Sequence, residues 1–170
     1  MTIFSICTTI LMAVANVQQP SVFDAFRQKS LEECINVEYE FSTTIAGFDT
    51  IGEGTVMIQG NSYHMKGNGV EIYCDGASTW LIDETAYEVI IESAASPDAG
   101  FLANPIMLLM NLEESGISYK VQNNSILLDM PDGSRYTIKI TALTTVPTKK
   151  PEAFRPPTEF SKQWVVTDLR

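Results

Sequence analysis

The sequence predicts an α+β domain built mainly from antiparallel β-strands. Large apolar residues fall on odd positions and polar residues on even positions along 37–45, which is typical of a half-buried strand. Short segments between residues 52 and 92 repeat this pattern and are separated by turn residues, as in an antiparallel meander. Helical patterns occur only after Ser21 and around 101–110. We therefore expect one sheet with helices on its apolar face.

The N-terminal segment predicts export. Residues 1–15 carry no charged side chain and end in Ala13-Val14-Ala15, a small-x-small site for signal peptidase. As a helix this segment would span only about 22 Å, less than the ~30 Å hydrocarbon core of a membrane. We expect a signal peptide cleaved after Ala15, leaving one exported domain over 16–170. A buried strand is the alternative, because no Lys or Arg precedes the apolar run.

The net charge limits the classes of binding partner, and the cysteine content limits the possible disulfides. The formal net charge of −10 argues against binding to nucleic acid or to anionic lipid. Cys34 and Cys74 follow the predicted signal peptide, and an envelope compartment would allow them to pair. The sequence therefore allows two alternatives: a disulfide between Cys34 and Cys74, or two free cysteines that act as small buried apolar residues.

The first elements follow from capping and periodicity. Val22, Phe23, Phe26 and Leu31 lie at helical spacing, and Ser21 can cap a helix that runs to about Cys34. After the strand at 37–45, further strands are expected at 53–59, 62–66, 70–74, 79–83 and 87–92. Alternate positions assign one apolar face to Val37, Tyr39, Phe41, Ile45, Met57, Tyr63, Met65, Val70, Ile72, Trp80, Ile82, Val89 and Ile91.

The second half of the chain begins with a different pattern. Residues 101–110 are apolar nearly all round, which predicts a buried or ligand-facing helix. Pro105 favours either two short helices or one helix beginning near Asn104. A hairpin is expected from 118–122 and 125–130, then a strand at 135–143. Four prolines make 146–158 extended, and 164–166 could return as a terminal strand.

The sequence lacks the constellation of a catalytic site. It has one histidine, and it shows no metal-ligand cluster, nucleophile elbow or glycine-rich phosphate loop. His64 falls on the polar side of its predicted strand, where a solvated histidine is expected. Asp83 and Glu84 are adjacent and point to opposite faces, which is unsuitable for a carboxylate pair. We expect no enzyme activity, no cofactor and no metal.

The apolar face and the methionines favour a hydrophobic container. Met57, Met65, Met107 and Met110 supply flexible surface that suits varied apolar partners. The same residues can also fill irregular gaps in an ordinary core. Composition alone therefore leaves a ligand cavity and a permanently packed sheet as alternatives.

The order of several landmarks resembles the LolA family of periplasmic lipoprotein carriers. An opening helix is followed by Gly52-x-Gly54, then by Cys74-Asp75-Gly76 with Trp80 shortly after, and then by the proline-led apolar run 104–109. Phe154-Arg155-Pro156-Pro157 and 165–170 are similar to the F-x-P-P and V-x-D-x-R ending common in that family. The resemblance covers about 21–170.

The resemblance implies an open half-barrel whose concave apolar face is covered by helices. It implies a monomer that carries acylated lipoproteins from an inner-membrane donor complex to an outer-membrane acceptor. The expected cavity consists of Phe41, Met57, Met65, Ile72, Trp80 and Ile82, and the expected lid of Leu102, Ile106, Met107, Leu109 and Met110. A sensor or interaction module, a binder of another hydrophobic ligand and a filled structural domain are the alternatives.

One position departs from the pattern of the family. An arginine after the second strand holds the lid closed in well-known members, whereas Gln59-Gly60-Asn61 stand at that place here. We therefore expect the lid to be controlled differently, or the cargo to differ.

Overall fold

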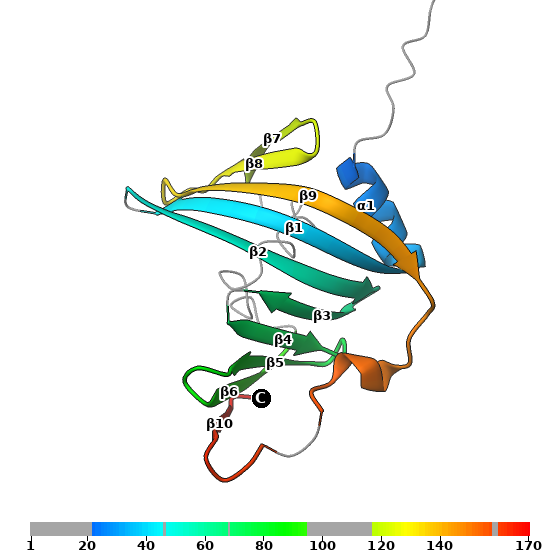
Figure 1. The fold of residues 1–170 in the computed structure, drawn as a ribbon, viewed down its shortest axis with the longest axis vertical. Helices are drawn as coiled ribbons and strands as arrows, with labels where there is room; N and C mark the ends of the chain where they lie inside the picture. Colours follow the sequence, from blue (N-terminus) through cyan, green and yellow to red (C-terminus); the bar gives the residue numbers. More distant parts are fainter. Residues whose placement is uncertain (1–21, 46, 68, 95–116, 158–159) are drawn as a thin grey trace, which may run out of the picture.

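The computed structural model describes residues 22–45, 47–67, 69–94, 117–157 and 160–170. Within these residues one helix, α1 (Val22–Glu32), lies against one mainly antiparallel sheet of ten strands (Figure 1). The strands are β1 (Cys34–Ile45), β2 (Phe48–Gln59), β3 (Ser62–Gly67), β4 (Val70–Cys74), β5 (Ser78–Asp83), β6 (Glu88–Ser93), β7 (Ser118–Gln122), β8 (Ser125–Asp129), β9 (Arg135–Val146) and β10 (Val165–Asp168). A short 3-10 helix, η1 (Pro151–Phe154), precedes β10.

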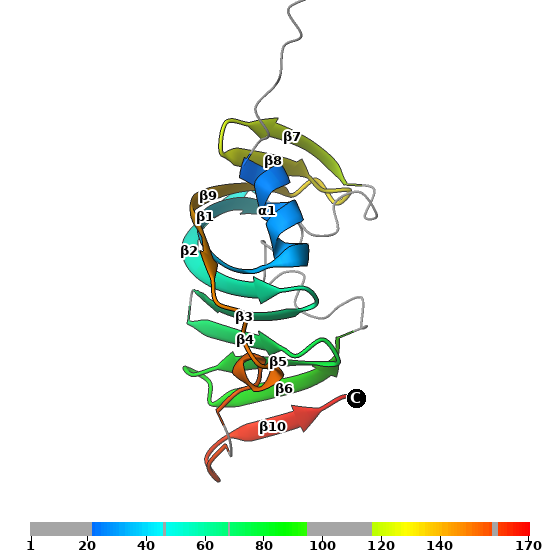
Figure 2. The ribbon, with the colours of Figure 1, turned by 90° about the vertical axis from the view of Figure 1, so that its right-hand side faces the viewer.

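The sheet is open, with β10 and β7 as its two edges. The strand order is β10-β6-β5-β4-β3-β2-β1-β9-β8-β7, and only the β10–β6 pair is parallel. β6 and β7 follow one another among the described strands, yet they lie near opposite ends of the sheet. Figure 2 shows β9, β1 and β2 curving round α1, which places the helix on the concave side. The prediction of an α+β, mainly antiparallel fold with an open sheet is thus confirmed.

The element boundaries differ from the prediction in places where a local pattern is weak. Helix α1 ends at Glu32 rather than Cys34, because Cys34 already pairs with Gln59 of β2. Strand β2 begins at Phe48 rather than residue 53, and its first four residues are all exposed. A segment that is exposed on both faces shows no alternation of apolar and polar residues. This segment pairs with β1 because it follows β1 directly in a hairpin. The predicted signal peptide and the apolar run 101–110 lie outside the described residues.

The two faces of the sheet follow from the strand register. Side chains opposite each other on paired strands share a face, so one row runs from Val37 through Val56 and Met65 to Ile72 and Leu81. We call this side the helix face, because Phe23 and Phe26 of α1 join its buried cluster. The other side is the outer face.

The outer face carries a second, smaller apolar cluster. Tyr73, Ile82, Val89 and Ile91 are buried there, and Trp80 is half-buried beside them. The C-terminal segment contributes Phe160 and Trp164 to this cluster. Residues 160–170 thus contribute side chains that cover β4–β6 on the side away from α1, in addition to the edge strand β10.

Cys34 and Cys74 are both buried, and both are free thiols. Cys34 lies in β1 and Cys74 in β4, with β2 and β3 between them. Three strand spacings of ~4.8 Å put about 14 Å between these strands. A disulfide requires Cα atoms within ~7 Å, so the pairing that the sequence left open does not form in this fold.

Candidate ligand-binding face

The helix face presents apolar side chains from one end of the sheet almost to the other. Strands β9, β1 and β2 provide its centre, which α1 contacts directly. Tyr119 and Val121 carry the apolar surface to the β7 edge, where both are exposed by about two fifths. The buried members on the strands are Ile35, Val37, Tyr39, Val56, Ile58, Tyr63, Met65, Ile72, Cys74, Ile126, Leu128, Tyr136, Ile138 and Ile140.

Three of the six predicted cavity residues lie on the helix face. Met65 and Ile72 are buried there, and Phe41 is half-buried against the same cluster. Met57, Trp80 and Ile82 lie on the outer face, so the six residues do not share one face as the alternation predicted. The helix face also carries Ile126, Leu128 and Ile138, which the sequence prediction omitted although they alternate in the strands that it expected.

Turn geometry explains why the six residues divide between the two faces of the sheet. The tight turn at Gly60 pairs Gln59 with Ser62, and so sets Met57 opposite His64 instead of Met65. The turn after Cys74 sets Trp80 opposite Tyr73. A shift of one residue exchanges the faces of a strand, so alternation within each strand was not enough to align neighbouring strands. The five predicted lid residues lie outside the described residues.

A polar cluster on the outer face surrounds the single histidine. His64 Nε2 lies 2.7 Å from Glu71 Oε1, and the Tyr73 hydroxyl donates to the same oxygen at 2.9 Å. The rings of His64 and Tyr73 stack with centroids 4.1 Å apart. His64 is therefore on the polar side as predicted, but it is held by partners rather than freely solvated.

The cluster sets the charge of Glu71. Desolvation by burial raises its pKa, but the hydrogen bonds from His64 and Tyr73 outweigh that effect and leave the pKa below its usual value of 4.5. Desolvation and the neighbouring Glu71 both raise the pKa of Tyr73, so its hydroxyl stays protonated and donates. The three side chains thus form one hydrogen-bonded and stacked cluster on the outer face.

The lowered pKa of Glu71 predicts a pH dependence of stability. A carboxyl group with a lower pKa in the folded state contributes stability above its unfolded pKa, and this contribution is lost as pH falls through the folded pKa. Urea midpoints should therefore drop between about pH 6 and about pH 3, and Glu71→Gln should flatten that drop. Glu38→Gln, an exposed carboxyl on the same face, is the control. An unchanged pH slope in Glu71→Gln would contradict the assignment.

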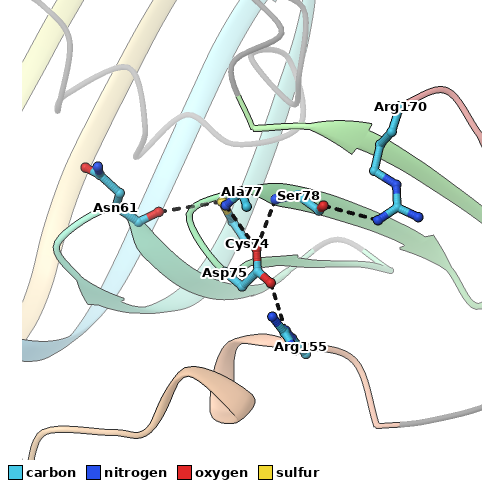
Figure 3. A network of polar contacts seen from close by, with 7 residues as sticks. All are labelled: Asn61, Cys74, Asp75, Ala77, Ser78, Arg155 and Arg170. Carbon is cyan, nitrogen blue, oxygen red and sulfur yellow. Dashed lines mark hydrogen bonds and ion pairs between the residues drawn. The ribbon is translucent and has the colours of Figure 1, made fainter.

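A polar network fixes the C-terminal segment to the turn after β4 (Figure 3). Asp75 Oδ1 accepts from the backbone N–H groups of Ala77 and Ser78 at 3.0 and 2.9 Å, and Arg155 Nε donates to Oδ2 at 2.7 Å. Arg170 donates to Ser78 Oγ at 3.3 Å and forms a two-pronged pair with Asp168. The hydrogen bonds from Arg170 lower the pKa of Asp168 to about 2. The Asp75-Gly76 turn and the two tail motifs, far apart in sequence, are thus one structural unit.

A pocket of about 770 Å³ opens on the sheet near the centre of β1–β3. Glu38, Glu40, Glu53 and Lys66 contribute to its walls, and Glu40 is paired with Lys139 at 2.9 Å. Its lining is more polar than apolar, so it does not suit a hydrocarbon chain. No group of three His, Cys, Asp or Glu within the described ranges is placed to hold a metal ion.

No helix in the described part of the chain is long and apolar enough to cross a membrane. Neither a scan against models of protein families nor a search of curated proteins finds a match to this sequence.

Proposed function

We propose that this chain is a non-enzymatic periplasmic carrier that binds the acyl chains of lipoproteins on the helix face and delivers them toward the outer membrane. The observation that carries the proposal is the open sheet, whose apolar helix face reaches the exposed β7 edge. The LolA-like order of landmarks and the export-like N-terminus support it. Each buried methylene group contributes about 0.8 kcal/mol, so acyl chains need an apolar surface to cross water.

The proposal places the hydrocarbon contact on Phe41, Met65 and Ile72 rather than on the outer face. Phe41 is half-buried beside the buried cluster and is the member that can be truncated with least damage to the core. Trp80 is also a half-buried aromatic residue, on the opposite side of the sheet. These two residues form a matched pair for testing which face holds the ligand.

The test is lipid retention by the full chain, expressed in a bacterial envelope and purified without detergent. Native mass spectrometry and lipid extraction should find acylated protein or lipid bound to the wild type. Phe41→Ala should reduce the fraction of protein with bound lipid about tenfold, because the loss of an aromatic contact costs ~1.5 kcal/mol or more. Trp80→Ala should retain the bound lipid. Equal loss in both variants would contradict the helix face as the site, and an empty wild type that takes up no lipid would exclude a carrier.

A second candidate, an interaction module that recognises a protein segment, is favoured by the end of the β1–β2 hairpin. Phe48 and Ile51 are 78% and 81% exposed there, which is unusual for large apolar side chains. If the wild type is empty, truncation of these two residues is the next experiment. Loss of a partner without any change in stability would favour the interaction module.

A further inference from the structure

A buried hydroxyl group interrupts the apolar helix face near the end of β1. Thr43 is only 8% exposed, and its Oγ1 has no hydrogen-bond partner in the part of the chain that the structure describes. Most buried polar side-chain atoms in proteins have a partner, so an unpaired one needs a physical explanation. The neighbouring Thr44 shows the usual situation, since its hydroxyl donates to Asp49 at 2.6 Å.

The register places Thr43 at the rim of the apolar surface. Thr43 and Phe41 share the helix face, because they are two positions apart on β1. Opposite Thr43, Tyr136 of β9 is buried, whereas Thr50 of β2 is exposed. The unpaired hydroxyl thus lies where buried hydrocarbon surface on one side meets solvent-exposed residues on the other.

An amphipathic ligand has the matching arrangement of groups. A hydrocarbon chain on the apolar part of the face would bring its polar end to this rim. The first polar atom of an acyl chain is a carbonyl oxygen, which accepts a hydrogen bond, and a threonine hydroxyl can donate one. An alkane would leave the hydroxyl unpaired and would gain nothing from it.

We propose that Thr43 Oγ1 donates a hydrogen bond to the carbonyl oxygen of an acyl ligand whose chain lies on the helix face. This inference rests on the proposed carrier function and adds the residue that recognises the polar end of the ligand, so that an ester or an amide of a fatty acid binds better than a bare hydrocarbon. Both ester and amide carbonyls occur in acylated molecules, and the hydroxyl can donate a hydrogen bond to either one.

The experiment measures displacement of N-phenyl-1-naphthylamine, an apolar fluorescent probe without a carbonyl, from protein expressed from the full chain. The competitors are methyl laurate, N-methyl lauramide and tridecane, which have similar chain lengths but carry an ester, an amide or no oxygen. Thr43→Val replaces the hydroxyl by a methyl group. It should weaken the binding of the ester or the amide about fivefold and leave the affinity for tridecane unchanged. Thr43→Ser should restore the affinity, and Thr50→Val, the exposed partner across the strand pair, should have no effect.

Stability gives a second readout that does not depend on a ligand. Removing an unpaired buried hydroxyl should raise the urea midpoint of the free Thr43→Val protein, whereas loss of a structural hydrogen bond would lower it. Equal changes for all three competitors, or a lowered midpoint, would overturn the role of Thr43 and leave the carrier function standing. A wild type that binds neither the probe nor any competitor would overturn both.

Discussion

Truncating Phe26 to alanine should destabilise the protein by about 3–5 kcal/mol, because removal of a buried aromatic side chain leaves a cavity. Phe26 is fully buried and joins α1 to the cluster on the helix face. The free energy of unfolding of a domain is only ~5–15 kcal/mol, so this one substitution removes a large fraction of it. Urea unfolding followed by tryptophan fluorescence measures the loss.

Leu31 provides the matched control on the same helix. It is 70% exposed, so Leu31→Ala should change the free energy of unfolding by no more than ~0.5 kcal/mol. Similar effects of both substitutions would mean that α1 does not anchor the concave side of the sheet. The same pair of variants can be examined for lipid retention, because Phe26 belongs to the buried cluster of the helix face on which the ligand is proposed to lie.

Gly67→Ala should cost about 3 kcal/mol, at the upper end of the range for inserting an atom into a packed site. A Cβ atom at Gly67 would lie 2.7 Å from the carbonyl oxygen of Glu53 and 3.0 Å from the Cα atom of Gly54. Both contacts are with backbone, so a side-chain rotation cannot relieve them. The midpoint of urea unfolding measures the effect.

Gly54→Ala should cost less, because its nearest neighbours belong to the Tyr39 side chain. The new Cβ would lie 2.6 Å from Tyr39 Oη and 2.8 Å from Cζ. A Tyr39→Leu background should therefore reduce the cost of Gly54→Ala and leave that of Gly67→Ala unchanged. Gly60→Ala tests a different effect, backbone strain, since Gly60 has φ of +57° and open space around the Cβ position, whereas Gly54 and Gly67 do not have a positive φ. A cost of Gly67→Ala below ~0.5 kcal/mol would contradict the close approach of β2 and β3 as the reason for glycine at this position.

The Gly54–Gly67 pair also bears on the shape of the helix face. The two glycines are opposite each other on β2 and β3, and Tyr39 on β1 covers Gly54. Tyr39 is 2% exposed, and burial raises the pKa of its hydroxyl to about 12. The missing side chains let the sheet accommodate a large aromatic ring at its centre. Gly52-x-Gly54, one of the landmarks of the family resemblance, thus contains a residue with a defined packing role.

The C-terminal segment has a structural role that local sequence patterns did not indicate. The prediction of a terminal strand was confirmed by β10, but its parallel pairing with β6 was not foreseen. Trp164 and Phe160 join the outer-face cluster, and Arg155 is tied to Asp75. These partners are distant in sequence, so no local pattern could identify them. They also explain why Trp80 and Ile82 are apolar although they lie away from α1.

The sequence by itself determined the fold class, the existence of the strands and which residues of a strand share a face. Alternation, turn residues and helical spacing act over a few residues, so the strand at 37–45 and the hairpin after 118 could be predicted without a structure. Only the tertiary structure decided which faces join across the sheet, because register depends on turn geometry and long-range pairing. It separated Met57, Trp80 and Ile82 from Phe41, Met65 and Ile72. It also separated Cys34 from Cys74 and left Thr43 unpaired at the rim of the helix face.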